Sequence, residues 1–187
     1  MANISKFQIF NNCIDSLKET SKDQKNSQYM NNSSMDVVNF DKVKNTYSIS
    51  GLNTSDFRSN DALIILNNDT NYIFVEFKNG TIDSGPKYEL ELEKIRNKIN
   101  ESLWIFNSIT NFNISNDKAS VKYILVYNAS KNRKFAIKKS QSIKAGKKFF
   151  ADNKLEHFLA FFKDVQTVTQ IEFDQIVNSI HSGTYIF

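Results

Sequence analysis

The sequence is poor in the residues on which several classes of site depend. Its 187 residues include one Cys and two His. A disulfide framework and a Cys-rich zinc site are therefore excluded, and a site built from several His ligands is nearly excluded. If the protein binds a metal, carboxylates must supply the ligands, and carboxylate ligands favour Mg²⁺ or Mn²⁺.

The sequence also lacks long hydrophobic runs. No apolar run approaches the roughly 18 residues that a membrane-spanning helix needs. The first residues, MANISKFQIFNNCIDSLKET, are too polar for a secretory signal peptide. We therefore expect a cytoplasmic protein without a membrane partner.

Apolar and aromatic residues, by contrast, are abundant. They make up 40% and 13% of the chain, which argues against disorder. A chain of this length can bury a core, and no repeat divides it, so we predict a single domain over residues 1–187. The net charge of +4 is mildly basic and does not by itself indicate nucleic-acid binding.

Hydrophobic periodicity predicts several helices. They are predicted over residues 4–20, from Pro86 to about Ser108, over 153–165 and over 169–181. Residues 21–36 are polar and have no period, so we predict a mobile loop there. Residues 37–50 are compatible with a short helix or with a strand.

Strand patterns lie between these helices. Two apolar runs separated by the turn sequence NNDTN predict a hairpin over residues 61–79. Residues 121–130 have a continuous apolar centre, which is typical of a strand inside a sheet. This order predicts a mixed α/β sandwich, with helices around a small central sheet.

The stretch NYIFVEFKNG, residues 71–80, places two charged residues in an otherwise apolar strand. Because side chains alternate along a strand, Glu76 and Lys78 project from the same face. In the predicted hairpin the start of the first strand lies near the end of the second, so Asp61 is brought to the same place. Two carboxylates and one ammonium are therefore expected to converge at an open end of the sheet.

Such a group of charges suits phosphate chemistry. Two neighbouring carboxylates repel each other, and a divalent cation relieves the repulsion. The cation can polarise a phosphate and lower the pKa of a bound water, while a lysine stabilises the charge that develops on the phosphate. The pattern therefore favours phosphodiester hydrolysis over ester or glycoside chemistry.

The pattern resembles that of the PD-(D/E)XK nuclease superfamily. Asn60-Asp61 matches the PD pair, with Asn in place of Pro, and Glu76-Phe77-Lys78 matches the (D/E)XK triplet. The specific part of the resemblance is residues 57–80. It implies an α/β fold with a restriction-endonuclease-like core, in which a mixed central sheet is flanked by helices in the order α-β-β-β-α-β.

The same resemblance implies roles for individual residues. Asp61 and Glu76 would be ligands of Mg²⁺ or Mn²⁺, and the backbone carbonyl of Phe77 would complete the protein side. Lys78 would be the catalytic lysine. The family often adds an acid from its first helix, and here we select Glu19.

Residues 131–148 contain basic residues and no acidic one, which predicts a surface that contacts phosphates. These basic residues are Lys131, Arg133, Lys134, Lys138, Lys139, Lys144, Lys147 and Lys148. Arg58 is a further candidate. Phe135, Phe149 and Phe150 offer rings for stacking on the bases of a single strand. The alternative is a solvated loop whose Phe side chains lie in the core.

These features predict a divalent-metal-dependent endonuclease acting on DNA or RNA, in restriction, phage defence, repair or a toxin system. Many nucleases of this type form homodimers to cut both strands, so a homodimer is compatible with this prediction, although no segment marks an interface. One alternative is a non-catalytic binding module that keeps the fold, such as an immunity protein, a phage-encoded inhibitor or an assembly subunit. Another is an unrelated fold in which Glu76 and Lys78 form an ion pair on an edge strand.

Overall fold

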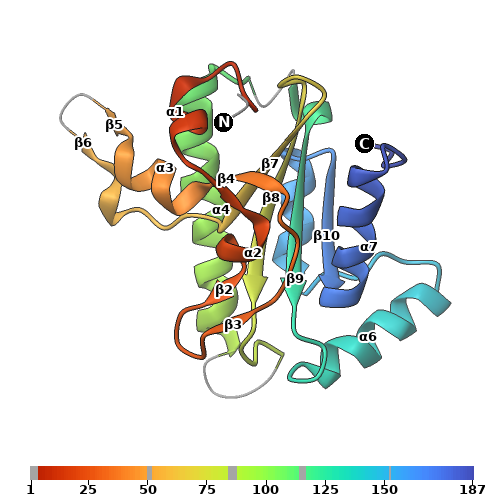
Figure 1. The fold of residues 1–187 in the computed structure, drawn as a ribbon. Coiled ribbons are helices and arrows are strands. Elements are labelled where there is room, and N and C mark those ends of the chain that lie inside the picture. Colours follow the sequence, from red (N-terminus) through yellow and green to blue (C-terminus); the bar gives the residue numbers. More distant parts are fainter. Residues whose placement is uncertain (1–3, 50–51, 84–87, 114–116, 152) are drawn as a thin grey trace.

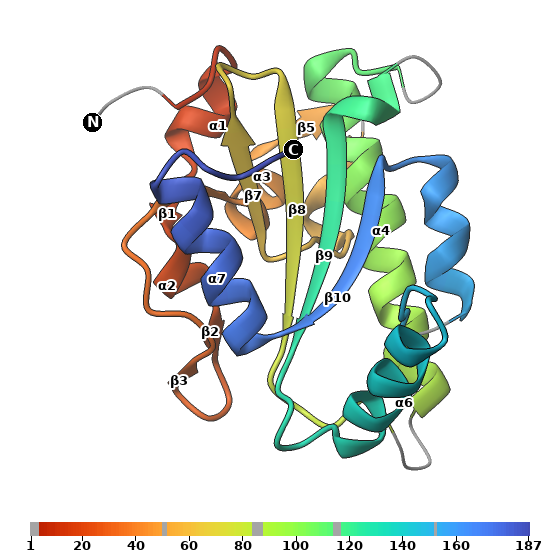
Figure 2. The same cartoon turned by 90° about the vertical axis from the view of Figure 1, so that its right-hand side faces the viewer.

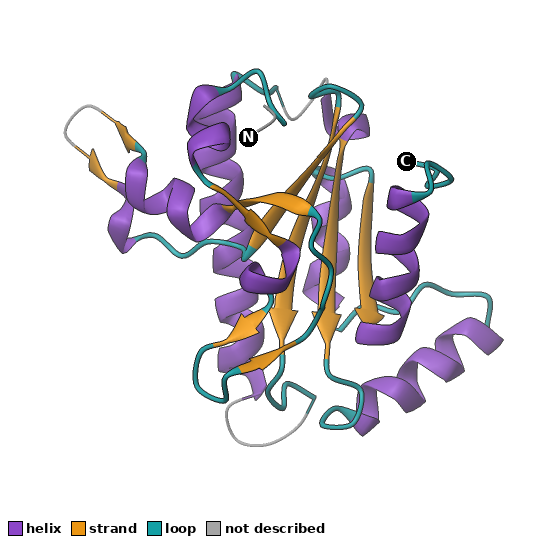
Figure 3. Cartoon of the chain, in the orientation of Figure 1, coloured by secondary structure: helices purple, strands orange, loops and turns teal. Residues whose placement is uncertain are grey.

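A computed structural model describes residues 4–49, 52–83, 88–113, 117–151 and 153–187, and its centre is a six-stranded sheet (Figure 1). The strand order is β1-β4-β7-β8-β9-β10. The strands are β1 (Ile14–Ser16), β4 (Asp36–Asn39), β7 (Ala62–Leu66), β8 (Asn71–Lys78), β9 (Val121–Tyr127) and β10 (Asp164–Thr169). In this order, neighbouring strands from β1 to β8 pair antiparallel, and neighbouring strands from β8 to β10 pair parallel. The predicted mixed α/β class is therefore confirmed, with helices around the sheet (Figure 3).

Strands β7 and β8 confirm the predicted hairpin over residues 61–79. The turn between them contains Asn67, Asn68 and Asp69, whose φ angles are 53°, 52° and 62°. Asn and Asp enter this left-handed region more readily than other non-glycine residues. The turn composition therefore allows the tight reversal that sets the register of the hairpin.

Helix α4 (Tyr88–Thr110) connects the end of β8 to the parallel strand β9. Its buried residues include the stripe that periodicity predicted: Leu92, Ile95, Ile99, Leu103 and Phe106. Pro86, the predicted first residue of this helix, lies outside the described residues. Strand β9 is buried along its whole length, as its apolar centre predicted.

The sheet separates two hydrophobic clusters. Helix α4 packs with Phe74 in one cluster, whereas helix α7 (Gln170–His181) packs with Val75 and Phe77 in the other. Figure 2 shows the two helices on opposite sides of the sheet. Because side chains alternate along β8, Glu76 and Lys78 face the α4 side.

The single helix predicted over residues 4–20 is wrong. This segment forms helix α1 (Gln8–Asn12), strand β1 and helix α2 (Leu17–Thr20). Phe10 belongs to the cluster on the α4 face and Leu17 to the cluster on the α7 face, so the apolar spacing serves two cores. Between them, Ile14 pairs with Val38 of β4.

The following segment has more structure than the sequence predicted. Residues 21–36 contain an antiparallel ribbon, β2 (Lys22–Asp23) and β3 (Gln28–Tyr29), instead of forming a loop throughout. Residues 37–50, which were compatible with helix or strand, contribute to β4 and then form helix α3 (Phe40–Thr46). The short pair β5 (Ser48–Ile49) and β6 (Leu52–Asn53) and the 3₁₀ helix η1 (Thr54–Asp56) follow.

In the C-terminal third of the chain, a second predicted helix is wrong. The basic segment contains helix α6 (Arg133–Lys144), and α7 confirms the helix predicted over 169–181. Residues predicted as a helix over 153–165 instead form the 3₁₀ helix η3 (Asn153–Ala160) and the start of β10, whose β-branched residues favour a strand. A short 3₁₀ helix, η2 (Lys118–Ser120), precedes β9. Within the described ranges, no helix combines the length and apolar character needed to cross a membrane.

Candidate active site

The three residues that the sequence pattern singled out lie together at the carboxyl end of β8. The hairpin register, extended by one residue, places Asp61 opposite Glu76. The Glu76 side chain is fully buried, and its Oε1 lies 2.8 Å from Lys78 Nζ. Strand β8 lies inside the sheet, so the ion pair of Glu76 and Lys78 exists but does not lie on an edge strand, as one alternative expected.

A fourth charged residue, Lys98 of helix α4, joins this group. Its Nζ lies 3.1 Å from Asp61 Oδ1, and 2.8 Å and 2.9 Å from the two carboxylate oxygens of Glu76. We call Asp61, Glu76, Lys78 and Lys98 the charged cluster. Lys98 is not among the site residues predicted from the sequence. The available signal was a polar pair one helical turn apart, Lys98 and Ser102, beside the apolar stripe of α4.

The two carboxylates of the charged cluster differ in acidity. Burial and the neighbouring Glu76 carboxylate raise the pKa of Asp61 to about 6. Burial also opposes ionisation of Glu76, but the Lys78 and Lys98 ammoniums outweigh it and lower the pKa of Glu76. Burial opposes the charge of Lys98 as well, but Asp61 and Glu76 outweigh this effect and raise its pKa. Glu76 is therefore the more firmly ionised carboxylate.

The backbone of Phe77 also faces Asp61. The Phe77 N–H donates to Asp61 Oδ2 at 2.6 Å. Because the N–H and C=O of one strand residue point to the same side, the Phe77 carbonyl is directed toward the Asp61 side of β8. The carbonyl of Lys78 points the other way and accepts from the Asn128 N–H at 3.1 Å.

Two buried polar side chains beside the charged cluster have no hydrogen-bond partner among the described residues. They are the amide of Asn60 and the hydroxyl of Tyr123. Burial, followed by the charges of Glu76 and Asp61, raises the pKa of Tyr123, so its hydroxyl lies within the electrostatic range of both carboxylates. Buried polar groups in folded proteins are usually hydrogen-bonded, so each of these two has room for a bond to an ordered water or an ion.

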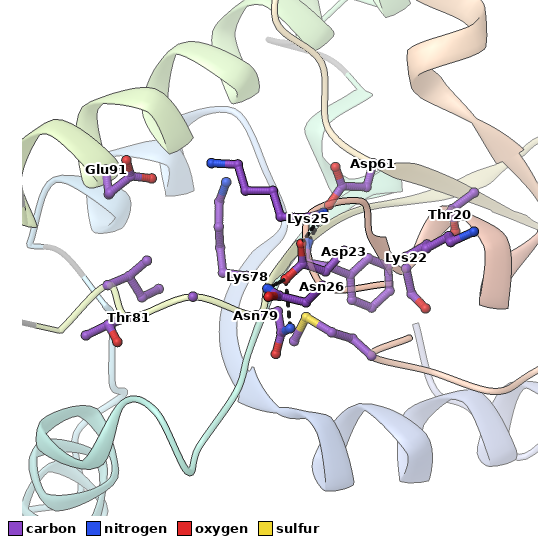
Figure 4. A pocket seen from close by; sticks show the side chains of 15 residues that line it. Thr20, Lys22, Asp23, Lys25, Asn26, Asp61, Lys78, Asn79, Thr81 and Glu91 are labelled. Atoms are coloured by element: carbon purple, nitrogen blue, oxygen red, sulfur yellow. Dashed lines mark hydrogen bonds between the residues drawn. The ribbon is translucent and has the colours of Figure 1, made fainter. Parts of the chain in front are cut away.

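A cavity of about 460 Å³ opens beside the charged cluster (Figure 4). Asp61 and Lys78 line it from the sheet, and Glu91 lines it from α4. The β2–β3 ribbon contributes Lys22 and Lys25. Glu76 and Lys98 lie behind this wall, so Asp61 and Lys78 are the members of the cluster that a bound molecule would meet first.

The oxygen donors of the site fit a hard divalent cation. Mg²⁺ is commonly held by one or two carboxylates and completed by waters and substrate phosphates. Asp61, Glu76 and the Phe77 carbonyl supply such donors once the Lys98 ammonium, which now contacts both carboxylates, moves aside.

A third acidic ligand does not join this set. In the part of the chain that the structure describes, no three His, Cys, Asp or Glu side chains gather as a metal site. Glu19, the acid selected from the sequence, is exposed on α2 and does not line the cavity.

The predicted phosphate-contacting residues divide into two groups. Lys139 pairs with Glu172, and Lys148 with Asp164, so these two ammoniums already have acidic partners. Lys131 is exposed and donates to Asn79 Oδ1 at 3.2 Å. The other basic residues of the prediction are exposed: Arg58, Arg133, Lys134, Lys138, Lys144 and Lys147.

The predicted aromatic contacts are partly wrong. Phe135 is fully buried and Phe149 is 8% exposed. Their rings pack edge-to-face on each other at 5.6 Å, in the core. Only Phe150 of the three is half-buried, so it alone retains a ring surface for a ligand.

No family model matches the chain, and neither a curated protein nor a solved structure matches it.

Proposed function

We propose that the protein is a divalent-metal-dependent nuclease of the PD-(D/E)XK type, which hydrolyses phosphodiester bonds in DNA or RNA. The observation that carries the proposal is the convergence of Asp61, Glu76 and Lys78 beside an open cavity. Asp61 and Lys78 line this cavity and Glu76 lies directly behind them, and two carboxylates with an ammonium match the requirements of phosphoryl chemistry.

The topology supports the proposal. Strands β4, β7 and β8 form an antiparallel meander, and helix α4 then leads to β9, which is parallel to β8. Short helices precede the meander. This order is compatible with the α-β-β-β-α-β core that the resemblance implies if β1, the β2–β3 ribbon, α3 and the β5–β6 pair are additions to that core.

In this proposal the residues of the site have different roles. Asp61, Glu76 and the Phe77 carbonyl would hold Mg²⁺ or Mn²⁺, which polarises the phosphate and lowers the pKa of a bound water. Lys78 lines the cavity and is 18% exposed, so its ammonium can donate to a phosphate oxygen that enters there. Glu76 holds this ammonium in place from behind.

Replacing Glu76 by Gln tests the proposal. The change removes the negative charge of the carboxylate while keeping the shape of the side chain. We expect the cleavage rate to fall by about 10²-fold or more. Calorimetric titration measures the binding of Mn²⁺. Cleavage is measured in parallel by incubating the protein with plasmid and with single-stranded RNA. Glu91→Gln is the matched control, because this acid lines the same cavity outside the charged cluster.

A second variant protects this test against simple misfolding. Glu76 is buried between two ammoniums, whereas Lys78 is partly exposed. Lys78→Gln should bind Mn²⁺ like the wild type and still lose cleavage rate. A folded wild-type protein that neither binds Mn²⁺ nor cuts either substrate would contradict the nuclease proposal.

One observation favours the alternative of a binding module that keeps the fold. The two ammoniums of the charged cluster balance its two carboxylates, so the group is already neutral without a cation. In that case Mn²⁺ would bind neither the wild type nor Glu91→Gln. The protein would bind nucleic acid without cleaving it, or it would bind a protein partner.

A further inference from the structure

A second and larger cavity borders the first turn of α4. Its volume is about 910 Å³, and Tyr88 and Glu89 of α4 line it together with Lys138 and Lys147. This size falls within the range of about 300–1,000 Å³ that ligand sites occupy. The cavity therefore has room for a nucleotide-sized group.

The two cavities are neighbours along one end of the molecule. The first turn of α4 borders both, since Tyr88 lines the second cavity and Glu91 lines the first. Figures 1 and 2 place helix α6, the β2–β3 ribbon and the carboxyl ends of β8 and β9 at this same end. A chain that lies across this turn of α4 would therefore border both cavities.

The second cavity offers two cations that have no acidic partner in the described ranges. Lys138 and Lys147 are exposed, and neither ammonium makes an ion pair there. The end of α6 sets the place of Lys147: Gly146 has φ +66°, and the Lys147 N–H donates to the Ser142 carbonyl at 2.8 Å. This hydrogen bond and the left-handed glycine form a Schellman turn, which holds Lys147 at the cavity.

Aromatic surface lies beside these cations. Phe150 and Tyr88 are half-buried, and both line the cavity. Glu89 and Glu156 also line it, and a carboxylate accepts hydrogen bonds from the amino group of a base. Cations and ring faces occur together in sites for single-stranded nucleic acid, because the strand exposes both its phosphates and its base faces.

We propose that the second cavity binds a single-stranded segment of the nucleic acid whose backbone enters the candidate active site. Lys138 and Lys147 contact its phosphates, and Phe150 and Tyr88 stack on a base. A duplex hides its base faces, and Asp61 is only 18% exposed, so both cavities suit a single strand better than a duplex. This inference rests on the proposed nuclease function and specifies its substrate class.

The test measures binding separately from cleavage. Fluorescence anisotropy with a labelled oligothymidylate, and then an oligouridylate, is recorded in EDTA at several salt concentrations. We expect the double variant Lys138→Gln/Lys147→Gln to bind about tenfold more weakly, with a salt slope smaller by about 1.4, for two lost contacts to a single strand. Phe150→Leu should also weaken binding about tenfold.

The matched control is Lys118→Gln/Lys163→Gln. It removes the same charge at exposed residues outside both cavities and outside the predicted phosphate-contacting segment. We expect this pair to change binding less than threefold. Equal losses in the two double variants would overturn the inference, and so would tighter binding of a duplex than of the single strand.

The outcomes also separate this inference from the nuclease proposal. Single-strand binding that depends on Lys138 and Lys147, without any metal-dependent cleavage, would support the second cavity while removing the catalytic function. Metal-dependent cleavage of a single strand with unchanged KM in the Lys138→Gln/Lys147→Gln variant would overturn the role of the second cavity while leaving the nuclease proposal intact.

Discussion

Lys98 contacts both candidate metal ligands, so its removal should couple the stability of the protein to the metal. In Lys98→Met, the Asp61 and Glu76 carboxylates face each other with Lys78 as their remaining cation in the charged cluster. Removing one partner from a buried ion pair typically costs about 3–5 kcal/mol. We expect the variant to melt at a lower temperature in EDTA, and Mn²⁺ to raise its Tm more than that of the wild type.

Thermal unfolding with EDTA and with Mn²⁺ measures this effect. Lys94→Met is the control, because Lys94 lies on the same helix but pairs with Glu91 at a more exposed position. If Mn²⁺ shifted the Tm of wild type and Lys98→Met equally, Lys98 would not compete with a cation, and the metal-binding role of Asp61 and Glu76 would lose its support.

Residue by residue, the sequence revealed the part of the site that is local. Glu76 and Lys78 are two apart on one strand, and a single hairpin brings Asp61 to them, so alternation was sufficient. Lys98 reaches the same place only because Ile95 and Ile99 pack against the sheet and set the rotation of α4. That rotation is a tertiary property, and a single sequence does not display it.

At the scale of elements, the junction of α6 and α7 gives a prediction about pH. Glu172 completes a capping box with Thr169 at the start of α7 and also pairs with Lys139 of α6. Partial burial opposes its ionisation, but the hydrogen bonds from Lys139 and from the Thr169 N–H outweigh it and lower its pKa. A carboxyl whose pKa is lower in the folded state stabilises the fold above its usual pKa of 4.5 and loses this effect as the pH falls.

Urea unfolding at neutral pH and at a pH below 4.5 tests this junction. Glu172→Gln should be less stable than the wild type at neutral pH, and the difference should shrink in acid. Glu93→Gln, at an exposed position of α4, is the control and should keep a constant small difference. A Glu172→Gln deficit that persists unchanged in acid would mean that the charge of Glu172 does not stabilise the junction.

The elements that sequence reasoning missed share one cause. Residues 4–20 carry helical spacing, yet Phe10 and Leu17 belong to cores on opposite faces of the sheet, and pairing of Ile14 with Val38 decides the local structure. Strand β10 likewise forms because β9 offers it a parallel edge. Both cases depend on a partner that is distant in sequence, whereas α4 carries its own periodicity and α7 also carries a capping box at its start.

At the scale of the whole molecule, Asn79 joins three regions at the end that carries both cavities. Its Nδ2 donates to Asp23 Oδ2 at 2.8 Å and to Gln28 Oε1 at 3.1 Å, in the β2–β3 ribbon. Its Oδ1 accepts from Asn128 Nδ2 at 2.8 Å and from Lys131 Nζ at 3.2 Å, between β9 and α6. A single side chain that is 6% exposed therefore fixes the wall of the first cavity relative to the sheet.

Asn79→Ala should release the ribbon without unfolding the sheet. The loss of buried hydrogen bonds costs about 1–3 kcal/mol, and this loss falls mainly on the ribbon, whose own pairing spans only β2 and β3. Hydrogen exchange should accelerate in peptides covering residues 22–29 and stay slow in β9, while Asn178→Ala on α7 should change neither. Because the ribbon carries Lys22 and Lys25 into the first cavity, single-strand binding should weaken with the same variant. Unchanged exchange at residues 22–29 would show that the ribbon keeps its position without Asn79. Any loss of binding would then have to arise from a change at the carboxyl end of β8.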